Sequence, residues 1–179
     1  QMSDDLTPEQ TVALLRDLHQ CLSRSVYENR GTLDKYLGDG IMASFGTPEP
    51  APRDASAALL AARCMLREME QLNRHRALLR QPPLTLAIGL HYGPLTLGNI
   101  GDENRLEYAL IGETVNVAHR LEQMTRSLNT QVCLSQAFID KLAEETRGDT
   151  GVIGDMVALQ PQPIRGLRDR MVIWVMQRP

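Results

Sequence analysis

Segment 31–46, GTLDKYLGDGIMASFG, is the part of the sequence that most restricts how this chain can fold. Two apolar-rich runs, 32–37 and 41–45, flank the tripeptide Gly38-Asp39-Gly40. An Asp-Gly pair between such runs predicts a tight β-hairpin, because glycine readily adopts the backbone angles of a sharp turn. The carboxylate of Asp39 then lies at the tip, where it is suited to hold a hard cation such as Mg²⁺.

Lys35 precedes Asp39 by four residues, so in a regular strand the two side chains project to the same face of the hairpin. On this segment alone a simpler interpretation is preferred. Asp39 is then a turn former and Lys35 a solvated strand residue. The choice between the two interpretations depends on the rest of the chain.

The size and composition of the chain favour one compact globular domain over residues 1–179. It has 179 residues, of which 42% are hydrophobic and 23% charged. A formal net charge of −3 argues against general affinity for nucleic acid or anionic membranes. No apolar run approaches the roughly 20 residues that span a bilayer. Three widely spaced cysteines indicate buried thiols in a reducing, cytoplasmic setting.

Hydrophobic periodicity predicts helices and strands in an order typical of α+β layers, an α/β sandwich with helices packed on a mainly antiparallel sheet. Thr7 and Gln10 form a capping box before the first helix. We expect helices at 8–29, 54–79, 112–128 and 136–146. We expect further strands at 84–90, 95–100, 106–111, 131–134, 152–159 and 171–176. The basic residues Arg74, His75, Arg76 and Arg80 are interpreted as a solvated helix end.

The third predicted helix carries a second candidate site. Asn116 and Arg120 are four residues apart, so they share one face near the helix N-terminus, where the helix dipole favours anions. This signal is weak by itself, since many helices begin with such residues. His91 is interpreted as a turn-stabilising histidine and not as a catalytic one, because no acid–base partner is nearby in the sequence.

The two candidate sites, each weak by itself, support each other, because the sequence blocks that contain them resemble class III adenylyl/guanylyl cyclase catalytic domains. The blocks are KYLGDGIMASFG at 35–46, HYGP at 91–94, GNIG at 98–101 and EYALIGETVNVAHRLE at 107–122. They occur in the family's order. Agreement over such long blocks is far more specific than a short glycine motif.

The resemblance implies a ferredoxin-like nucleotidyl cyclase fold that works as a head-to-tail homodimer, with its active sites between the subunits. It implies conversion of ATP into 3′,5′-cyclic AMP and pyrophosphate, assisted by two Mg²⁺ or Mn²⁺ ions per site. Family members usually follow sensor or regulatory modules, so such domains are expected upstream in a longer protein.

Matched position by position, the resemblance assigns a role to each site residue. Asp39 is a metal ligand, and Lys35 donates to the adenine ring. Asn116 positions the ribose, and Arg120 stabilises the pentavalent phosphorus. Arg165, in a shorter match, contacts the terminal phosphates. In the family's dimers Lys35 and Asp39, although close in sequence, serve different active sites.

The sequence departs from the family pattern at two places. The F-x-D-I-x-G-F motif, which carries the family's other metal aspartate, is absent, and Asp4 and Asp5 do not match it. Either the supplied chain lacks its first β-strand or the domain is degenerate, and the abrupt start favours the former. Ala109 occupies the position of an Asp or Thr that accepts a hydrogen bond from the adenine amino group.

These departures keep alternatives open. A catalytically silent, cyclase-like regulatory or nucleotide-binding module explains the missing aspartate. A guanylate cyclase is a further alternative, although the Glu and Cys usual in guanylyl cyclases are absent. A generic α/β binding domain requires the block matches to be accidental.

Overall fold

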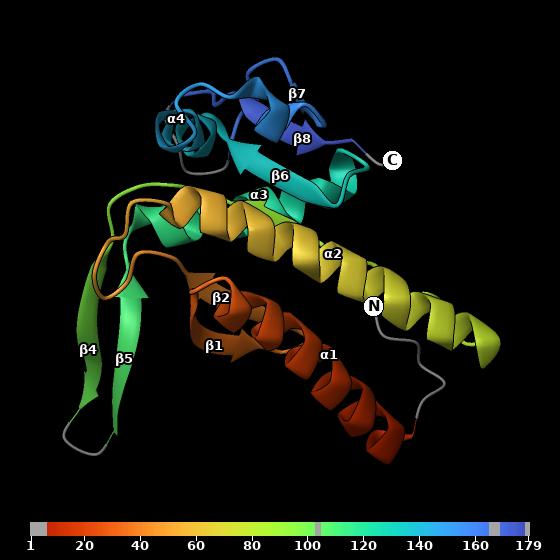
Figure 1. The fold of residues 1–179 in the computed structure, drawn as a ribbon. Helices are drawn as coiled ribbons and strands as arrows, with labels where there is room; N and C mark the ends of the chain where they lie inside the picture. The colour runs from red at the N-terminus through yellow and green to blue at the C-terminus, as the bar shows by residue number, and fades with distance from the viewer. Residues whose placement is uncertain (1–6, 103–104, 165–168, 178–179) are drawn as a thin grey trace. The chain divides into compact units, whose positions relative to one another are not determined.

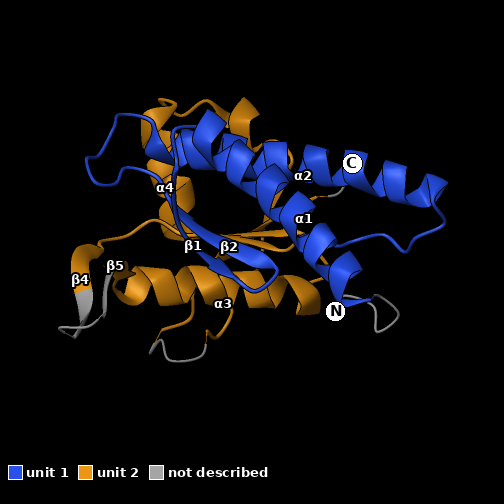
Figure 2. Ribbon diagram, turned by 90° about the horizontal axis from the view of Figure 1, so that it is seen from below, with its two compact units in different colours: residues 1–86 blue, residues 87–179 orange. Residues whose placement is uncertain are grey.

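The computed structural model describes residues 7–102, 105–164 and 169–177 of the chain. Its contacts divide the chain into two compact units, residues 1–86 and 87–179, which Figure 2 colours separately. The elements, in chain order, are α1 (Pro8–Glu28), β1 (Thr32–Leu37), β2 (Gly40–Ser44), α2 (Asp54–Leu78), β3 (Ile88–Leu90), β4 (Thr96–Asp102), β5 (Arg105–Ile111), α3 (Glu113–Ser127), β6 (Val132–Ser135), α4 (Gln136–Glu145), the 3₁₀ helix η1 (Thr150–Ile153), β7 (Met156–Ala158) and β8 (Ile173–Met176). The predicted α+β class is confirmed.

Helix α1 begins with the predicted capping box. The Thr7 hydroxyl accepts from the Gln10 amide, and the Gln10 side chain accepts from the Thr7 amide. One face of the helix buries four apolar side chains, Leu14, Leu18, Leu22 and Val26. In the first unit α1 packs against α2 and against both strands of the β1–β2 hairpin (Figure 1). The helix is therefore a fixed support for the hairpin.

The β1–β2 hairpin forms where the Asp-Gly signal predicted it. The strands are antiparallel, and Leu37 pairs with Gly40 on either side of the turn. Gly38 has φ +64°, a left-handed conformation that glycine adopts without strain. The ladder is irregular between Leu33 and Lys35, so the hairpin contains a β-bulge that the sequence did not reveal.

The second unit contains a four-stranded sheet in the order β3-β6-β8-β7 and a separate β4–β5 hairpin (Figure 1). Strands β3 and β6 are parallel, whereas the β6–β8 and β8–β7 pairs are antiparallel. Helix α3 packs on β3 and β6. Its buried side chains join a hydrophobic cluster of Val117, Leu121, Cys133, Ile164 and Ile173.

Two predicted strands are shorter than expected, because side chains take up the backbone groups that a ladder would use. The predicted strand 84–90 is reduced to β3, since the Asn73 amide bonds to both the backbone N–H and the C=O of Leu84. The predicted strand 152–159 gives way to η1 and then β7. The Asp149 carboxylate accepts from the Gly151 amide and so starts the 3₁₀ turn.

Two predictions about polar and reactive side chains need correction. Arg76 is 7% exposed, and its Nε donates a hydrogen bond to the Pro82 carbonyl. The side chain is therefore buried and is not part of a solvated helix end. All three cysteines are free thiols, but only Cys133 is buried, whereas Cys21 and Cys64 are partly exposed. No helix within the described ranges is long and apolar enough to cross a membrane.

Gly89 of β3 lies directly against the backbone of α3. A Cβ at this position would collide with the Ala118 carbonyl oxygen and lie 2.5 Å from the Glu122 backbone nitrogen. Both atoms belong to the α3 backbone and cannot move aside as a flexible side chain would. Glycine at residue 89 therefore sets how near α3 lies to the sheet.

We expect Gly89→Ala to lower the free energy of unfolding by about 3 kcal/mol, the upper range for overpacking, because α3 must move away from β3. Urea denaturation monitored by circular dichroism measures the change. Gly98→Ala is the matched control, since its Cβ would meet Ile111 Cδ1 at an ordinary 3.5 Å. Equal stability of the two variants would contradict the close-approach argument.

Candidate active site

Asp39 occupies the turn between β1 and β2, and its side chain is exposed. The residue before it, Gly38, has open space where a Cβ would be. The Gly38 carbonyl accepts a hydrogen bond at 2.9 Å from His19 Nε2 of α1. The turn therefore exposes a carboxylate to solvent, while its backbone is hydrogen-bonded to helix α1.

Lys35 faces Asp34, and this arrangement corrects the simple face argument for a Lys35–Asp39 pair. The Lys35 ammonium lies 3.9 Å from Asp34 Oδ2, and the two side chains are 37% and 6% exposed. Adjacent residues of a regular strand point to opposite faces, but the bulge at this place relaxes that alternation. Asp39, for its part, lies in the turn and not in a strand.

Asp34 is a residue that sequence reasoning missed. Its Oδ2 atom is buried and has no hydrogen-bond partner within the described part of the chain. The Lys35 ammonium is too distant for a hydrogen bond, so it compensates the buried charge only by attraction across 3.9 Å. The available signal was an aspartate inside a predicted strand, where aspartate is depleted.

Helix α3 carries Asn116 and Arg120 one turn apart, as predicted. Asn116 is exposed, and Arg120 is partly buried. The N-cap residue of the helix is Gly112, which has no side chain to accept from the first N–H groups. Ala109 of β5 is 6% exposed and offers only a methyl group.

Two hydrogen bonds connect the HYGP segment to neighbouring elements of its unit. The Thr114 hydroxyl, in the first turn of α3, donates to the Pro94 carbonyl at 2.5 Å. His91 Nδ1 lies 2.7 Å from the Ser135 hydroxyl, which also accepts from the Phe138 amide at the start of α4. The Ser135 hydroxyl can donate to His91 Nδ1 or accept from it, since the tautomer of the ring sets the direction of this bond. His91 therefore connects the end of β3 to α4.

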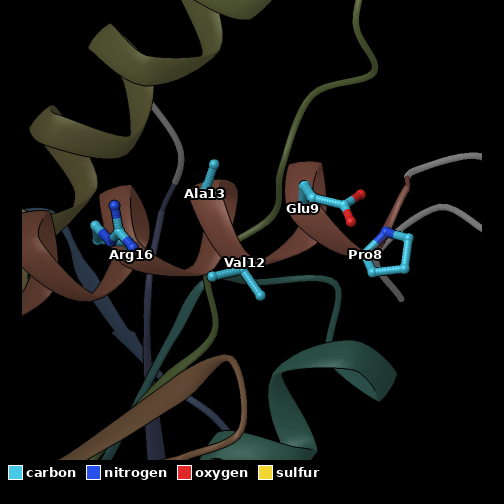
Figure 3. Close-up of a pocket in the computed structure, with 5 residues that line it drawn as sticks. All are labelled: Pro8, Glu9, Val12, Ala13 and Arg16. Atoms are coloured by element: carbon cyan, nitrogen blue, oxygen red, sulfur yellow. The ribbon is translucent and has the colours of Figure 1, made fainter.

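The predicted residues fall into two groups. Lys35 and Asp39 share one hairpin in the first unit, whereas Ala109, Asn116 and Arg120 lie on β5 and α3 of the second. Arg165 lies outside the described residues. Figure 3 shows a surface hollow lined by α1 residues alone, and none of the predicted site residues lines it.

The hairpin offers one ligand of the kind that a hard divalent cation prefers. Asp39 supplies one exposed carboxylate, an oxygen ligand of the kind that Mg²⁺ and Mn²⁺ prefer. Among the described residues no three His, Cys, Asp or Glu side chains cluster as a metal cage. A single carboxylate fits a cation held mainly by substrate phosphates, which is how Mg²⁺ is commonly bound in nucleotide enzymes.

Comparison with known proteins decides the family. Residues 1–177 match the family model described as the adenylate and guanylate cyclase catalytic domain. The chain belongs to this cyclase family. The predicted blocks at 35–46, 91–94 and 107–122 all lie within the matched region.

Curated relatives of the cyclase domain include two bacterial adenylate cyclases. The chain is 29% identical over 146 residues to an adenylate cyclase of Anabaena cylindrica, covering 79% of this chain and 28% of that protein. It is 31% identical over 138 residues to adenylate cyclase 1 of Rhizobium meliloti, covering 77% of this chain and 21% of that protein. The chain therefore spans less than a third of the length of either relative.

Solved cyclase structures share the fold over almost the whole chain. The adenylyl cyclase CyaB from P. aeruginosa has a TM-score of 0.81 at 27% identity, covering 99% of this chain and 87% of that one. The guanylyl cyclase Cya2 has a TM-score of 0.79 at 28% identity, covering 97% and 83%. Similarity to an adenylyl and a guanylyl enzyme is nearly equal, so the overall likeness does not select the base.

The His91 environment predicts a pH dependence of stability. Burial lowers the pKa of His91 from its ordinary value of 6.5, although nearby Glu113 acts in the opposite direction. The unfolded chain therefore takes up a proton at a higher pH than the folded one, and stability falls as the pH drops below about 6.5. Urea denaturation between pH 7 and pH 5 should show this loss.

His91→Asn, whose side-chain amide can donate to or accept from Ser135, should reduce the slope of stability against pH over that interval. His75→Asn is the control, since His75 is exposed on α2. An unchanged slope in His91→Asn would show that His91 does not titrate differently in the folded chain.

Proposed function

We propose that this domain is the catalytic domain of an adenylate cyclase that converts ATP into 3′,5′-cyclic AMP and pyrophosphate. The observation that carries the proposal is the family match together with Asp39, Asn116 and Arg120 at the positions of the family's catalytic side chains. Their placement on an exposed turn and near the N-terminus of α3, where the helix dipole favours anions, supports the handling of a polyphosphate.

The reaction requires the ribose 3′-hydroxyl to attack the α-phosphorus in line with the departing pyrophosphate. In the proposed mechanism the Asn116 amide orients the ribose, so that the hydroxyl stays close to the phosphorus. The Arg120 guanidinium donates to oxygens that gain negative charge in the transition state. Asp39 holds the divalent cation. When bound, Mg²⁺ or Mn²⁺ ions would lower the pKa of the 3′-hydroxyl and neutralise the negative charge of the phosphates.

Choice of adenine is proposed to depend on Lys35. Its ammonium has only donors, so it matches adenine N1, which is an acceptor, and not guanine N1, which carries hydrogen. Ala109 provides no acceptor for the adenine amino group. We therefore expect a preference for ATP that is weaker than a two-contact site would give, since one such hydrogen bond is worth roughly 1.5–3 kcal/mol.

The site is proposed to form between two copies of the chain, with Asp39 from one copy and Lys35, Asn116 and Arg120 from the other. Lys35 and Asp39 then act in different sites although they share a hairpin. Regulatory domains elsewhere in a longer protein are also proposed, because the bacterial adenylate cyclases that match are several times longer than the matched region.

A nucleotide-binding module without turnover is the second candidate function. It is favoured by one specific observation: Asp39 is the only carboxylate of the Gly38–Gly40 turn, so this turn supplies a single ligand to a cation. Such a module would bind ATP and leave it intact. Retention of both Asn116 and Arg120 favours the enzyme, since binding alone does not need a group aimed at the transition state.

The deciding experiment incubates the purified protein with ATP or GTP and with Mg²⁺ or Mn²⁺, and quantifies cyclic nucleotide by chromatography and mass spectrometry. The proposal predicts cyclic AMP from ATP and slower cyclic GMP formation from GTP. Faster cyclic nucleotide formation from GTP than from ATP would show that the domain is a guanylate cyclase. Nucleotide binding with no cyclic product would assign the silent module.

Arg120→Ala should lower kcat by about 100-fold while the KM for ATP changes by less than about threefold, because the guanidinium acts mainly in the transition state. Arg126→Ala is a matched control, since it removes the same charge from an exposed position of the same helix. A higher KM with an unchanged kcat in Arg120→Ala would instead show that Arg120 binds the substrate and the transition state equally well.

Lys35→Ala should lower the ratio of kcat/KM for ATP to kcat/KM for GTP by about tenfold, as expected for loss of one charged hydrogen bond. Competition between the two nucleotides in one reaction measures this ratio directly. Circular dichroism checks the fold of this variant, because Lys35 also faces the buried carboxylate of Asp34. An unchanged ratio would remove Lys35 from base selection but would leave the fold assignment untouched.

A further inference from the structure

We propose that His19 is a positioning residue that holds the Gly38–Gly40 turn in the orientation in which Asp39 binds the divalent cation. This inference rests on the proposed function of Asp39. His19 touches the hairpin at two places: Nε2 lies 2.9 Å from the Gly38 carbonyl oxygen, and the ring centroid lies 4.4 Å from that of Tyr36.

The turn needs such a support because little else restrains it. A two-stranded hairpin is only marginally stable by itself. Gly38 has φ +64° and is free of contacts where a side chain would begin, so its backbone has several accessible conformations. Asp39 is exposed, so packing does not fix its carboxylate. A bond to the carbonyl of the preceding residue fixes the peptide group that leads directly into Asp39.

His19 is mounted on a rigid element. It lies in the middle of α1, between Leu18 and Leu22, which are 8% and 2% exposed. The helix is capped at Thr7 and packs on α2, so the imidazole position is set by the core of the unit. Contacts that orient a metal ligand are most effective when they come from such elements.

The two contacts lie between the functional residues of the hairpin, Lys35 and Asp39, and each is next to one of them. Tyr36 directly follows Lys35, and its ring is tilted by 32° to the imidazole. Gly38 directly precedes Asp39. The carbonyl of Gly38 can only accept, so Nε2 carries the hydrogen, and both the neutral Nε2–H form and the imidazolium can make this bond. The support therefore operates in either charge state of His19.

The test compares the wild-type protein with His19→Ala, His19→Gln and Gln20→Ala. Glutamine carries a terminal N–H₂ group able to donate to the Gly38 carbonyl, so His19→Gln is the conservative rescue. Gln20 is the exposed neighbour on the same helix, so its variant controls for changes to α1 itself. Each protein is titrated with Mn²⁺ in the presence of a non-hydrolysable ATP analogue, and binding is followed by water proton relaxation.

His19→Ala should weaken Mn²⁺ binding by about tenfold, the lower range for loss of a contact that orients a metal ligand. His19→Gln should stay within about threefold of the wild type, and Gln20→Ala should match it. Hydrogen exchange adds a second measurement: the amides of residues 38–40 should exchange about tenfold faster in His19→Ala, while those of α1 keep their rates.

Unchanged Mn²⁺ affinity and unchanged exchange at the turn in His19→Ala would overturn the proposal. Faster exchange throughout α1 would also overturn it, because the effect would then be general destabilisation. If His19→Ala does not fold, His19→Gln against the wild type decides, with near-normal Mn²⁺ binding supporting the proposal and a larger loss opposing it. A wild type that binds Mn²⁺ but makes no cyclic nucleotide would refute the cyclase activity alone.

Discussion

Helix α3 lies against strand β3 because residue 89 has no side chain. The Ala118 carbonyl and the Glu122 amide nitrogen occupy the space that a Cβ would need. Around this contact Val117 and Leu121 pack into the buried cluster of the second unit. The outward-facing turn of the same helix is left to carry Asn116 and Arg120. The position of the proposed site residues on α3 thus depends on one close backbone approach.

The proposed site residues of the hairpin depend on a helix as well. The hairpin that carries Lys35 and Asp39 packs on α1, and α1 is held by its capping box and its buried apolar face. Both groups therefore use the same construction, in which a packed helix fixes polar residues that are themselves exposed or partly exposed. This division allows the core to stabilise the fold while the proposed site residues remain accessible.

Much of the fold could be predicted from local signals. The Asp-Gly turn and the Thr7 capping box are short-range patterns with a direct physical cause, and both are present in the structure. Features decided by contacts distant in sequence were missed. Examples are the Asn73 amide that takes up the backbone groups of Leu84 and the burial of Arg76 against the Pro82 carbonyl.

The candidate site shows the same limit. The block matches identified Asp39, Lys35, Asn116 and Arg120 as candidates, because motif order is visible in the sequence. The β-bulge between Leu33 and Lys35, where the Lys35 and Asp34 side chains face each other, depends on strand register, which no single residue indicates. The contact of His19 with Gly38 joins residues 19 positions apart on different elements. Periodicity alone gives no reason to single out His19 on its helix.

The central claim is that Asp39 and Arg120 act across two copies of the chain, and mixing inactive variants tests it most directly. Asp39→Asn and Arg120→Ala, each nearly inactive alone, are combined at equal concentration and allowed to exchange subunits. A mixed dimer then contains one site with both mutations and one intact site. Random exchange predicts recovery of about a quarter of the wild-type cyclic AMP formation. If both residues acted within one chain, the mixture would stay as inactive as its components.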